Sequence, residues 1–213
     1  MNVTTAIIGE SGTGKSASMR NLDPANTLLI QTVRKPLPFK SKNWKLLSAE
    51  NKDGNVLVTR DHAQILRAAL HTRRPVVVID DFQYLMFGEM MDRSSETGYQ
   101  KFTDMAAHVW SLITELNQAD GDKRIYFMCH SEEKESGGIR IKTVGKMLHE
   151  KLTVEGLFTI VMKTQVFNGH YQFTTKNNGS DPVKTPIGLF EDETIDNDLS
   201  AVDAAISAYY GDN

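Results

Sequence analysis

The sequence predicts a protein of the α/β class, with a mostly parallel central sheet, helices on both faces and an antiparallel hairpin near the C-terminus. Apolar runs of strand length alternate along the chain with segments of helical periodicity, the order that produces parallel strands joined by helices. The run PVVVIDD at 75–81 is rich in β-branched residues, as in a strand buried on both faces of a parallel sheet. The pair Asn168-Gly169 between two apolar runs indicates a hairpin turn.

Length and composition favour one domain over residues 1–213, because 213 residues can bury one core and the chain is 40% hydrophobic and 24% charged. No apolar run approaches the roughly 18 residues that cross a bilayer, and we see no secretion signal. The single cysteine, Cys129, agrees with a reducing compartment and is expected to be a small buried hydrophobe. We therefore expect a cytoplasmic protein. A net charge of -3 means that any binding to nucleic acid needs a local basic patch.

The first half of the chain is expected to alternate strands and helices. The apolar run VTTAII precedes a glycine-rich turn and a helix. Asp61 is suited to cap a helix whose apolar residues follow at helical spacing. The expected strands are 3–8, 27–33 and 75–81, with short strands at 43–48 and 54–59, and the expected helices are 15–21 and 61–72.

The second half is expected to begin with a long connection at 84–100, which contains three methionines and two glycines. An amphipathic helix at 101–118 and a buried strand at 124–130 follow it. The remaining expected elements are a polar loop at 131–146, a short helix at 145–152, strands at 157–165 and 169–176, and a helix at 200–210.

The strongest motif is GESGTGKS, in which Gly9 is followed by four residues and then by Gly14, Lys15 and Ser16. This is the Walker A pattern, and it lies between an apolar strand and a helix, as phosphate-binding loops do. The expected cofactors are ATP and Mg²⁺, with Lys15 reaching the β and γ phosphates and the Ser16 hydroxyl binding the metal. The expected phosphate-binding residues are Gly9, Glu10, Ser11, Gly12, Thr13, Gly14, Lys15, Ser16 and Ala17.

Three polar residues at strand ends complete the predicted site. Asp80 is expected to hold the Mg²⁺ through Ser16 or water. Asp81 is a candidate base that orients or deprotonates the attacking water; alternatively, it caps a helix or forms a loop salt bridge. His130, at the end of the next strand, is a candidate sensor of the γ phosphate; alternatively, it is simply solvated or hydrogen bonded.

Several segments together resemble the phage-encoded RecA-like ATPases, including the single-strand annealing type: GESGTGKS, VVVIDDFQYLM, MCHSEEKE, VGKMLHEKL and KTPIGLFEDETIDNDL. The resemblance implies a RecA-like P-loop NTPase fold, self-assembly with ATP bound between subunits, and action in phage recombination or replication. It further implies binding to single-stranded DNA, partners among phage proteins, no membrane association, and a place in the cytoplasm of the host cell.

By position, the resemblance assigns DNA contacts to the segments 84–100 and 131–146. The first offers aromatic residues that can stack on bases, namely Tyr84, Phe87 and Tyr99. The second carries three glutamates that weaken the case for a basic patch, and for both segments a solvated surface connection is the alternative. The candidate DNA-binding residues are Arg93, Lys134, Arg140, Lys142 and Lys146.

The sequence also departs from the RecA pattern. RecA has a catalytic glutamate at the end of its second strand, whereas here that region, LIQTVRK, has no acid. Turnover is therefore expected to depend on Asp81 or to be slow. Lys176 and Lys184 are either cations offered to a neighbouring subunit or solvated lysines. Because no cation other than Lys15 is evident in the site, we expect the chain to assemble with copies of itself.

Three other functions fit parts of the pattern. VIDDFQYL also resembles the AAA+ initiators and helicase loaders, which carry a helical lid with an arginine, whereas here the predicted elements after the core are strands with lysines. A small-molecule kinase normally has several lid arginines, whereas 131–146 holds only Arg140. A nucleotide-gated interaction protein with little hydrolysis agrees with the missing glutamate.

Overall fold

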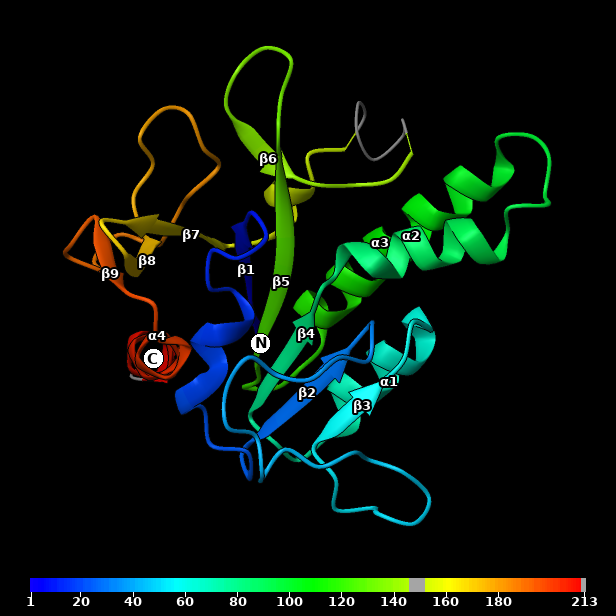
Figure 1. Ribbon diagram of the computed structural model, residues 1–213, viewed down its shortest axis with the longest axis horizontal. Helices are drawn as coiled ribbons and strands as arrows, with labels where there is room; N and C mark the ends of the chain where they lie inside the picture. Colours follow the sequence, from blue (N-terminus) through cyan, green and yellow to red (C-terminus); the bar gives the residue numbers. More distant parts are fainter. Residues whose placement is uncertain (146–151, 212–213) are drawn as a thin grey trace.

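The computed structural model describes residues 1–145 and 152–211, whose centre is a nine-stranded sheet (Figure 1). Its strands are β1 (Val3–Gly9), β2 (Thr27–Gln31), β3 (Val56–Val58), β4 (Val76–Asp80), β5 (Arg124–Glu133), β6 (Ile139–Ile141), β7 (Ile160–Phe167), β8 (His170–Thr174) and β9 (Thr194–Asp196). Its helices are α1 (His62–His71), α2 (Gln83–Asp92), α3 (Gln100–Gln118) and α4 (Leu199–Gly211), with 3-10 turns η1 (Ser16–Asn21) and η3 (Val154–Leu157).

The sheet is mostly parallel, which confirms the predicted α/β fold class of a P-loop NTPase. The strand order is β3-β2-β4-β5-β1-β7-β8-β9, and the strands from β3 to β7 along this path run parallel. The hairpin of β7 and β8 turns at Asn168 and Gly169, as predicted, and β9 extends it as a further antiparallel strand. Strand β5 lies between β1 and β4, and its residue His130 pairs with Gly9 at the end of β1. The loop after β1 and the acids at the end of β4 therefore flank His130, which lies within β5 and not at its end.

Helices cover both faces of the sheet (Figure 1). Alternate residues of β1 point to opposite faces: Ala6 and Ile8 belong to the apolar core beneath α1, α2 and α3, and Ile7 belongs to the core beneath η1 and α4. Both cores are closed to solvent, since these three side chains have 0% exposure. Burial on both faces explains why the central strands are continuous apolar runs.

The segment 84–100, predicted to be a connection, is in large part helical, because α2 spans Gln83–Asp92 and α3 begins at Gln100. Helix α2 buries Leu85 and Met86 while Tyr84, Phe87 and Met91 remain exposed on its outer side. Apolar residues therefore lie on both sides of the helix, and the contrast between polar and apolar faces that marks an amphipathic helix is absent.

Gly88 lies inside α2, where a side chain from another segment packs closely against the helix. A Cβ on Gly88 would lie 2.6 Å from Nη1 and 2.7 Å from Cδ of Arg60, which packs across the helix at that point. Glycine is a weak helix former, but at this position it allows the close approach of the Arg60 side chain, which would have to shift if a larger residue replaced Gly88. The sequence alone gives no sign of this contact.

The segment 131–146, predicted to be a loop, contains a short antiparallel hairpin. Strand β5 continues to Glu133, and its last residues pair with β6, with Ser131 opposite Ile141.

The other differences between the predicted and the observed elements are small. Residues 43–48 contribute only one bridge, Leu46 with Val56, and the predicted helix at 15–21 is the 3-10 turn η1. Strand β9 and the 3-10 turn η3 were not predicted, and most of the helix predicted at 145–152 lies outside the described residues.

Cys129 lies in the core with no exposure, as predicted, and burial raises the pKa of its thiol. In the described ranges, no helix combines the length and the apolar character that crossing a bilayer requires.

Candidate nucleotide-binding site

The Walker A residues form a tight loop between β1 and η1. Gly12 and Gly14 have φ angles of 81° and 99°, in the left-handed region that glycine adopts at little cost. A Cβ on Gly14 would also lie 2.9 Å from Cδ1 of Tyr171, so a side chain there would collide with a ring from β8. The loop is fastened at its other side, where the Thr13 hydroxyl lies 2.6 Å from that of Thr164 in β7.

Lys15 lies folded against the loop that precedes it. Its side chain has 6% exposure, and Nζ donates to the carbonyl oxygens of Gly9 and Glu10, both at 2.7 Å. Burial lowers the pKa of Lys15 to about 8, although the charges of Asp81 and Asp80 oppose this shift. A buried ammonium held only by carbonyl oxygens is well suited to bind the negative charge of a phosphate group.

The structure brings Ser16 and Asp80 together. The Ser16 hydroxyl donates to Asp80, with Oγ 2.9 Å from Oδ1 and 3.1 Å from Oδ2. Asp80 has 1% exposure, and burial together with the adjacent charge of Asp81 raises its pKa. These hydroxyl and carboxylate oxygens are the donors that Mg²⁺ prefers.

The described residues hold no group of three or more His, Cys, Asp or Glu side chains that could hold a metal ion by themselves. This fits Mg²⁺, which usually binds one or two protein oxygens and completes its shell with water and substrate phosphates. Ser16 and Asp80 therefore suit the predicted metal.

The Asp81 side chain lies between two basic side chains, those of Lys35 and His130. Its carboxylate forms an ion pair with Lys35, and its Oδ1 lies 3.5 Å from Nε2 of His130. Burial opposes ionisation of Asp81, but the hydrogen bonds from His130 and Lys35 prevail and lower its pKa. Its φ of 57° is costly for a residue other than glycine, and such strain is most often found at functional sites. The salt bridge that we named as an alternative is thus present, and the role as base stays a prediction.

Lys35 is the site residue that the sequence analysis missed. It follows β2 in a loop that is fixed by Pro36 and Pro38, and its carbonyl oxygen accepts from Nε2 of Gln31 at 3.1 Å. Burial opposes its charged form, yet the hydrogen bond with Asp81 raises its pKa. Lys35 lines the same cavity as the Walker A loop, so the site contains a second cation and self-assembly no longer follows from the lack of one. The only signal in the sequence was a lysine in the segment where RecA has its glutamate.

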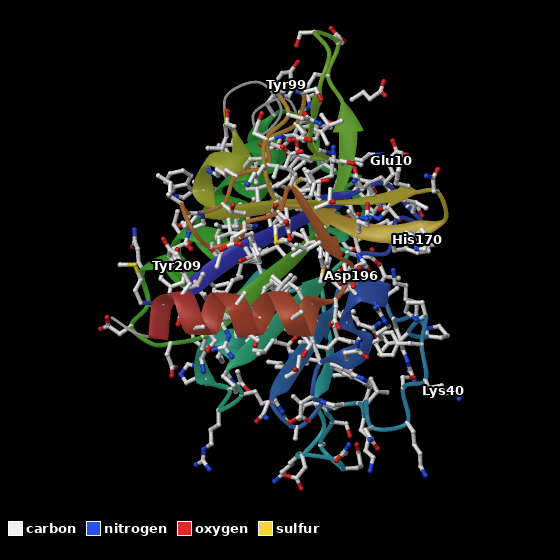
Figure 2. The ribbon with its side chains drawn as sticks, turned by 90° about the vertical axis from the view of Figure 1, so that its left-hand side faces the viewer. Glu10, Lys40, Tyr99, His170, Asp196 and Tyr209 are labelled. Atoms are coloured by element: carbon white, nitrogen blue, oxygen red, sulfur yellow. The ribbon has the colours of Figure 1, made fainter. Side chains whose placement is uncertain are left out.

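These residues surround a cavity of about 550 Å³, a size suited to a small ligand. It is lined by Ser11, Gly12, Gly14, Lys15, Ser16, Ala17, Lys35, Pro36, Pro38, Asp81, His130 and Tyr171. Of the other predicted binding residues, Gly9 and Glu10 supply carbonyl oxygens to Lys15, and Thr13 fastens the loop to β7. Figure 2 shows the Glu10 side chain on the same side of the molecule as His170 and Lys40.

His130 links the cavity to α2. Its backbone N–H donates to Oε1 of Gln83 at 3.3 Å, and its ring lies edge-on to Tyr84 with centroids 6.4 Å apart. A residue that contacts Asp81 on one side and the first turn of α2 on the other is well placed to transmit a change in the cavity. The sensor role is still a prediction.

Those predicted DNA-binding residues that the structure describes do not line this cavity. The Arg93 guanidinium binds three carboxylates between α2 and α3, those of Glu89, Glu96 and Asp104, at 3.1, 2.7 and 2.7 Å. Its charge is therefore largely satisfied within the protein.

The remaining candidates lie on the hairpin of β5 and β6 or beyond it. Lys134 and Lys142 are exposed, Arg140 binds Glu132 at 2.9 Å, and Lys146 lies outside the described residues. Near the C-terminal hairpin, Lys176 donates to the carbonyl oxygen of Glu191, and Lys184 is exposed.

A Walker A loop after the first strand, with its serine facing an aspartate at the end of a second parallel strand, defines a P-loop nucleotide-binding ATPase. The comparison with protein families agrees: the family model described as an AAA domain matches residues 1–186. The chain therefore belongs to the AAA domain family of P-loop ATPases. No curated protein matches it.

Proposed function

We propose that the protein is a Mg²⁺-dependent ATPase that acts on DNA in phage recombination or replication, as a self-assembling RecA-like protein that binds single-stranded DNA. The observation that carries the ATPase part is the contact of Ser16 with the buried Asp80 beside a cavity lined by the Walker A loop. The resemblance of the motifs, from GESGTGKS to KTPIGLFEDETIDNDL, supports self-assembly, the action on DNA and the phage setting.

In this proposal, the backbone N–H groups of the Walker A loop bind the phosphates, and Lys15 exchanges its two carbonyl partners for phosphate oxygens. Ser16 and Asp80 hold the metal, which supplies Lewis-acid stabilisation of phosphate charge. The Lys35 ammonium, at the Asp81 side of the same cavity, neutralises charge that develops on the γ phosphate.

Asp81 orients the attacking water in this mechanism. Its lowered pKa makes it a weak proton acceptor, because a general base works best with a pKa near the operating pH. Turnover is accordingly slow until a change in the cavity weakens the contacts of Asp81 with Lys35 and His130. DNA binding near α2 is one means of producing that change, through Tyr84 and His130.

The proposed DNA contacts are aromatic as well as basic. Tyr84, Phe87 and Tyr99 have exposures of 40%, 43% and 87%, and exposed rings of this kind can stack on unpaired bases. Lys134 and Lys142 supply positive charge from the β5–β6 hairpin, with Lys146 as a further candidate. Arg93 is the weakest of the original candidates, because three carboxylates already bind it.

A nucleotide-gated interaction protein with little hydrolysis is the second candidate function. The ion-paired state of Asp81 favours it, and the exposed apolar side chains of α2 begin at Tyr84, next to His130. The AAA+ loader is an alternative that fits the AAA family match, although strands β7 to β9 follow the core. The kinase is less supported, because Arg140 is bonded to Glu132.

Phosphate release, measured with and without single-stranded DNA, tests the proposal. Stimulation by DNA is expected; transfer of phosphate to a nucleoside indicates the kinase, and silence under both conditions indicates the gate. Measuring the mass in solution with an ATP analogue and a single-stranded oligonucleotide then tests self-assembly. A monomeric mass with both ligands present contradicts that part of the proposal.

A further inference from the structure

The loop that follows β2 carries a concentration of positive charge, of which the nucleotide-binding site uses only Lys35. Residues 24–49 contain five basic residues and no acidic one, although the whole chain has a net charge of -3. The five are Arg34, Lys35, Lys40, Lys42 and Lys45. We call residues 33–46 the basic loop. A local excess of positive charge on a protein of negative net charge favours binding of a polyanion at that place.

Three cations of the basic loop are available to a ligand. Arg34, Lys40 and Lys42 are exposed, and none of them forms an ion pair with any residue in the described ranges. In Figure 2, Lys40 lies at the edge of the molecule. Lys45 differs from these three, because it lines a separate cavity together with two aspartates. The charge that a polyanion can use is therefore concentrated in the first part of the loop.

A cavity of about 430 Å³ opens beside these cations, and we call it the basic-loop cavity. No acidic side chain is found among the described residues that line it. Its walls combine two cations with an indole ring and aliphatic side chains, namely Arg34, Lys35, Trp44, Pro36, Leu37 and Leu46. Walls of this composition suit a ligand that carries negative charge and a planar apolar group.

Trp44 is held in position at the wall of this cavity. Its ring is partly buried against the core beneath η1 and α4 and lies edge-on to Phe39, with centroids 6.2 Å apart. Its backbone N–H donates to the carbonyl oxygen of Ser41 at 2.9 Å, and the N–H of Lys45 donates to Oδ1 of Asn55 at 2.7 Å. A ring that is already positioned loses little conformational freedom when a base stacks on it.

Single-stranded DNA fits the basic-loop cavity better than duplex DNA or an acidic polypeptide does. Each nucleotide of a single strand offers a phosphate charge together with an unpaired, planar base. In a duplex the bases are paired and stacked inside the helix, so their faces do not reach an aromatic side chain such as Trp44. An acidic polypeptide offers the charge without a planar ring beside each charge.

We propose that the basic loop binds single-stranded DNA, with phosphates on Arg34, Lys40 and Lys42 and a base against Trp44. The inference rests on the proposed action on DNA, and it adds a binding surface outside α2 and the β5–β6 hairpin. Lysine and arginine side chains neutralise the phosphates, and the indole ring supplies a stacking contact that tolerates any base.

Lys35 connects this surface to the nucleotide-binding site. Lys35 and Pro36 line both cavities, so the two cavities meet at these residues. The Lys35 side chain is 40% exposed, and its ammonium forms the ion pair with Asp81. A DNA phosphate in the basic-loop cavity competes with the Asp81 carboxylate for this ammonium. Binding of DNA thus releases Asp81 from one of its two basic partners, which is the change that the proposed turnover requires.

The two tryptophans of the chain, Trp44 and Trp110, allow a direct test on the full-length protein. Trp110 is 48% exposed on α3, outside the basic loop. In Trp110→Phe, which leaves Trp44 as the only tryptophan, an oligonucleotide of thymidines should quench most of the fluorescence. In Trp44→Phe, the same oligonucleotide should leave the fluorescence of Trp110 nearly unchanged.

A pair of charge variants tests the phosphate contacts. The double variant Arg34→Gln, Lys40→Gln should weaken binding of the oligonucleotide by about tenfold and reduce the salt dependence by about 1.4 in logarithmic slope, since each phosphate contact on a single strand contributes about 0.7. It should keep the basal rate of phosphate release and lose most of the stimulation by DNA. The matched control, Arg67→Gln, Arg73→Gln, removes the same charge from two exposed positions outside the loop and should behave like the wild-type protein.

The outcomes separate the basic loop from the function on which it depends. An oligonucleotide that binds without quenching Trp44, or that binds both double variants equally well, overturns the basic loop as a binding surface while the proposed action on DNA stands. Absence of any binding to single-stranded DNA overturns that action itself. Duplex DNA or polyglutamate that quenches Trp44 as strongly as the oligonucleotide does contradicts the choice of single-stranded DNA. Full stimulation of phosphate release in Arg34→Gln, Lys40→Gln contradicts the coupling through Lys35.

Discussion

The pKa of Lys15 gives a prediction that links nucleotide binding to pH. Burial lowers this pKa from 10.5 to about 8 in the free protein. Phosphate oxygens around the ammonium favour its charged form, so the pKa rises again when a nucleotide binds. Binding must therefore take up a proton wherever free Lys15 is neutral, and affinity must fall as the pH rises above about 8.

The size of the effect follows from that value. At about pH 9, one unit above the pKa, roughly one free molecule in eleven carries the Lys15 proton, so the affinity should be about tenfold lower than at pH 7. A lysine with its ordinary pKa of 10.5 would lose only a few per cent under the same conditions. Phosphate groups are already ionised across this range, because their second pKa is about 6.

Calorimetry with Mg·ATP at about pH 7.5 and pH 9, each in two buffers of different ionisation enthalpy, measures both the affinity and the proton uptake. We expect about 0.9 of a proton to be taken up at pH 9 and about a quarter of a proton at pH 7.5. Lys15→Arg is a suitable control, because arginine keeps its charge throughout, so any binding that remains should not vary with pH. Affinity of the wild-type protein that stays constant over this range would refute the assignment of Lys15 as a buried phosphate ligand.

Three further predictions follow from the same contacts. Lys15→Met should raise the free energy of unfolding near pH 7 by about 1 to 3 kcal/mol, because the lowered pKa of Lys15 in the folded protein means that its buried ammonium costs stability below about pH 8. This cost disappears as the pH rises toward 10.5. Denaturant titration measures the free energy of unfolding, and a variant less stable than the wild-type protein contradicts the prediction. Asp81→Asn should leave Mg·ATP affinity within about twofold and slow phosphate release by up to about 100-fold, because a carboxylate no longer orients the attacking water; an unchanged rate eliminates Asp81 as the residue that orients the water. A double-mutant cycle of Lys35→Met and Asp81→Asn should show a coupling free energy of about 1 kcal/mol in stability. The coupling is small because the Lys35 side chain is 40% exposed and solvent screens the ion pair. Strictly additive effects of the two substitutions mean that the ion pair contributes nothing to stability.

Those parts of the fold that depend on local pattern were predictable from the sequence. The β-branched run of β4, the Walker A loop and the Asn168-Gly169 turn each depend on neighbouring residues, and the structure has all three. Helix α2 was not predictable in the same way, because the exposed Phe87 and the close packing of Arg60 on Gly88 remove the pattern that marks a surface helix.

Much of the candidate site followed from spacing, and the rest depended on tertiary structure. Ser16 and Asp80 were predicted to meet because the Walker pattern implies it, and they lie 2.9 Å apart. Lys35 joins the cavity only because β2 lies beside β4 and the loop after β2 turns toward Asp81. No spacing along the chain reveals a contact made across two strands.

The central claim is that the Walker A loop, with Ser16 and Asp80, binds a magnesium-bound purine triphosphate. Calorimetry of the wild-type chain and of Lys15→Ala with Mg·ATP tests it most directly. We predict a saturable heat with one site per chain for the wild-type protein and none for the variant. Absence of any heat with the wild-type protein and either ATP or GTP, or tight binding retained by Lys15→Ala, would contradict the claim.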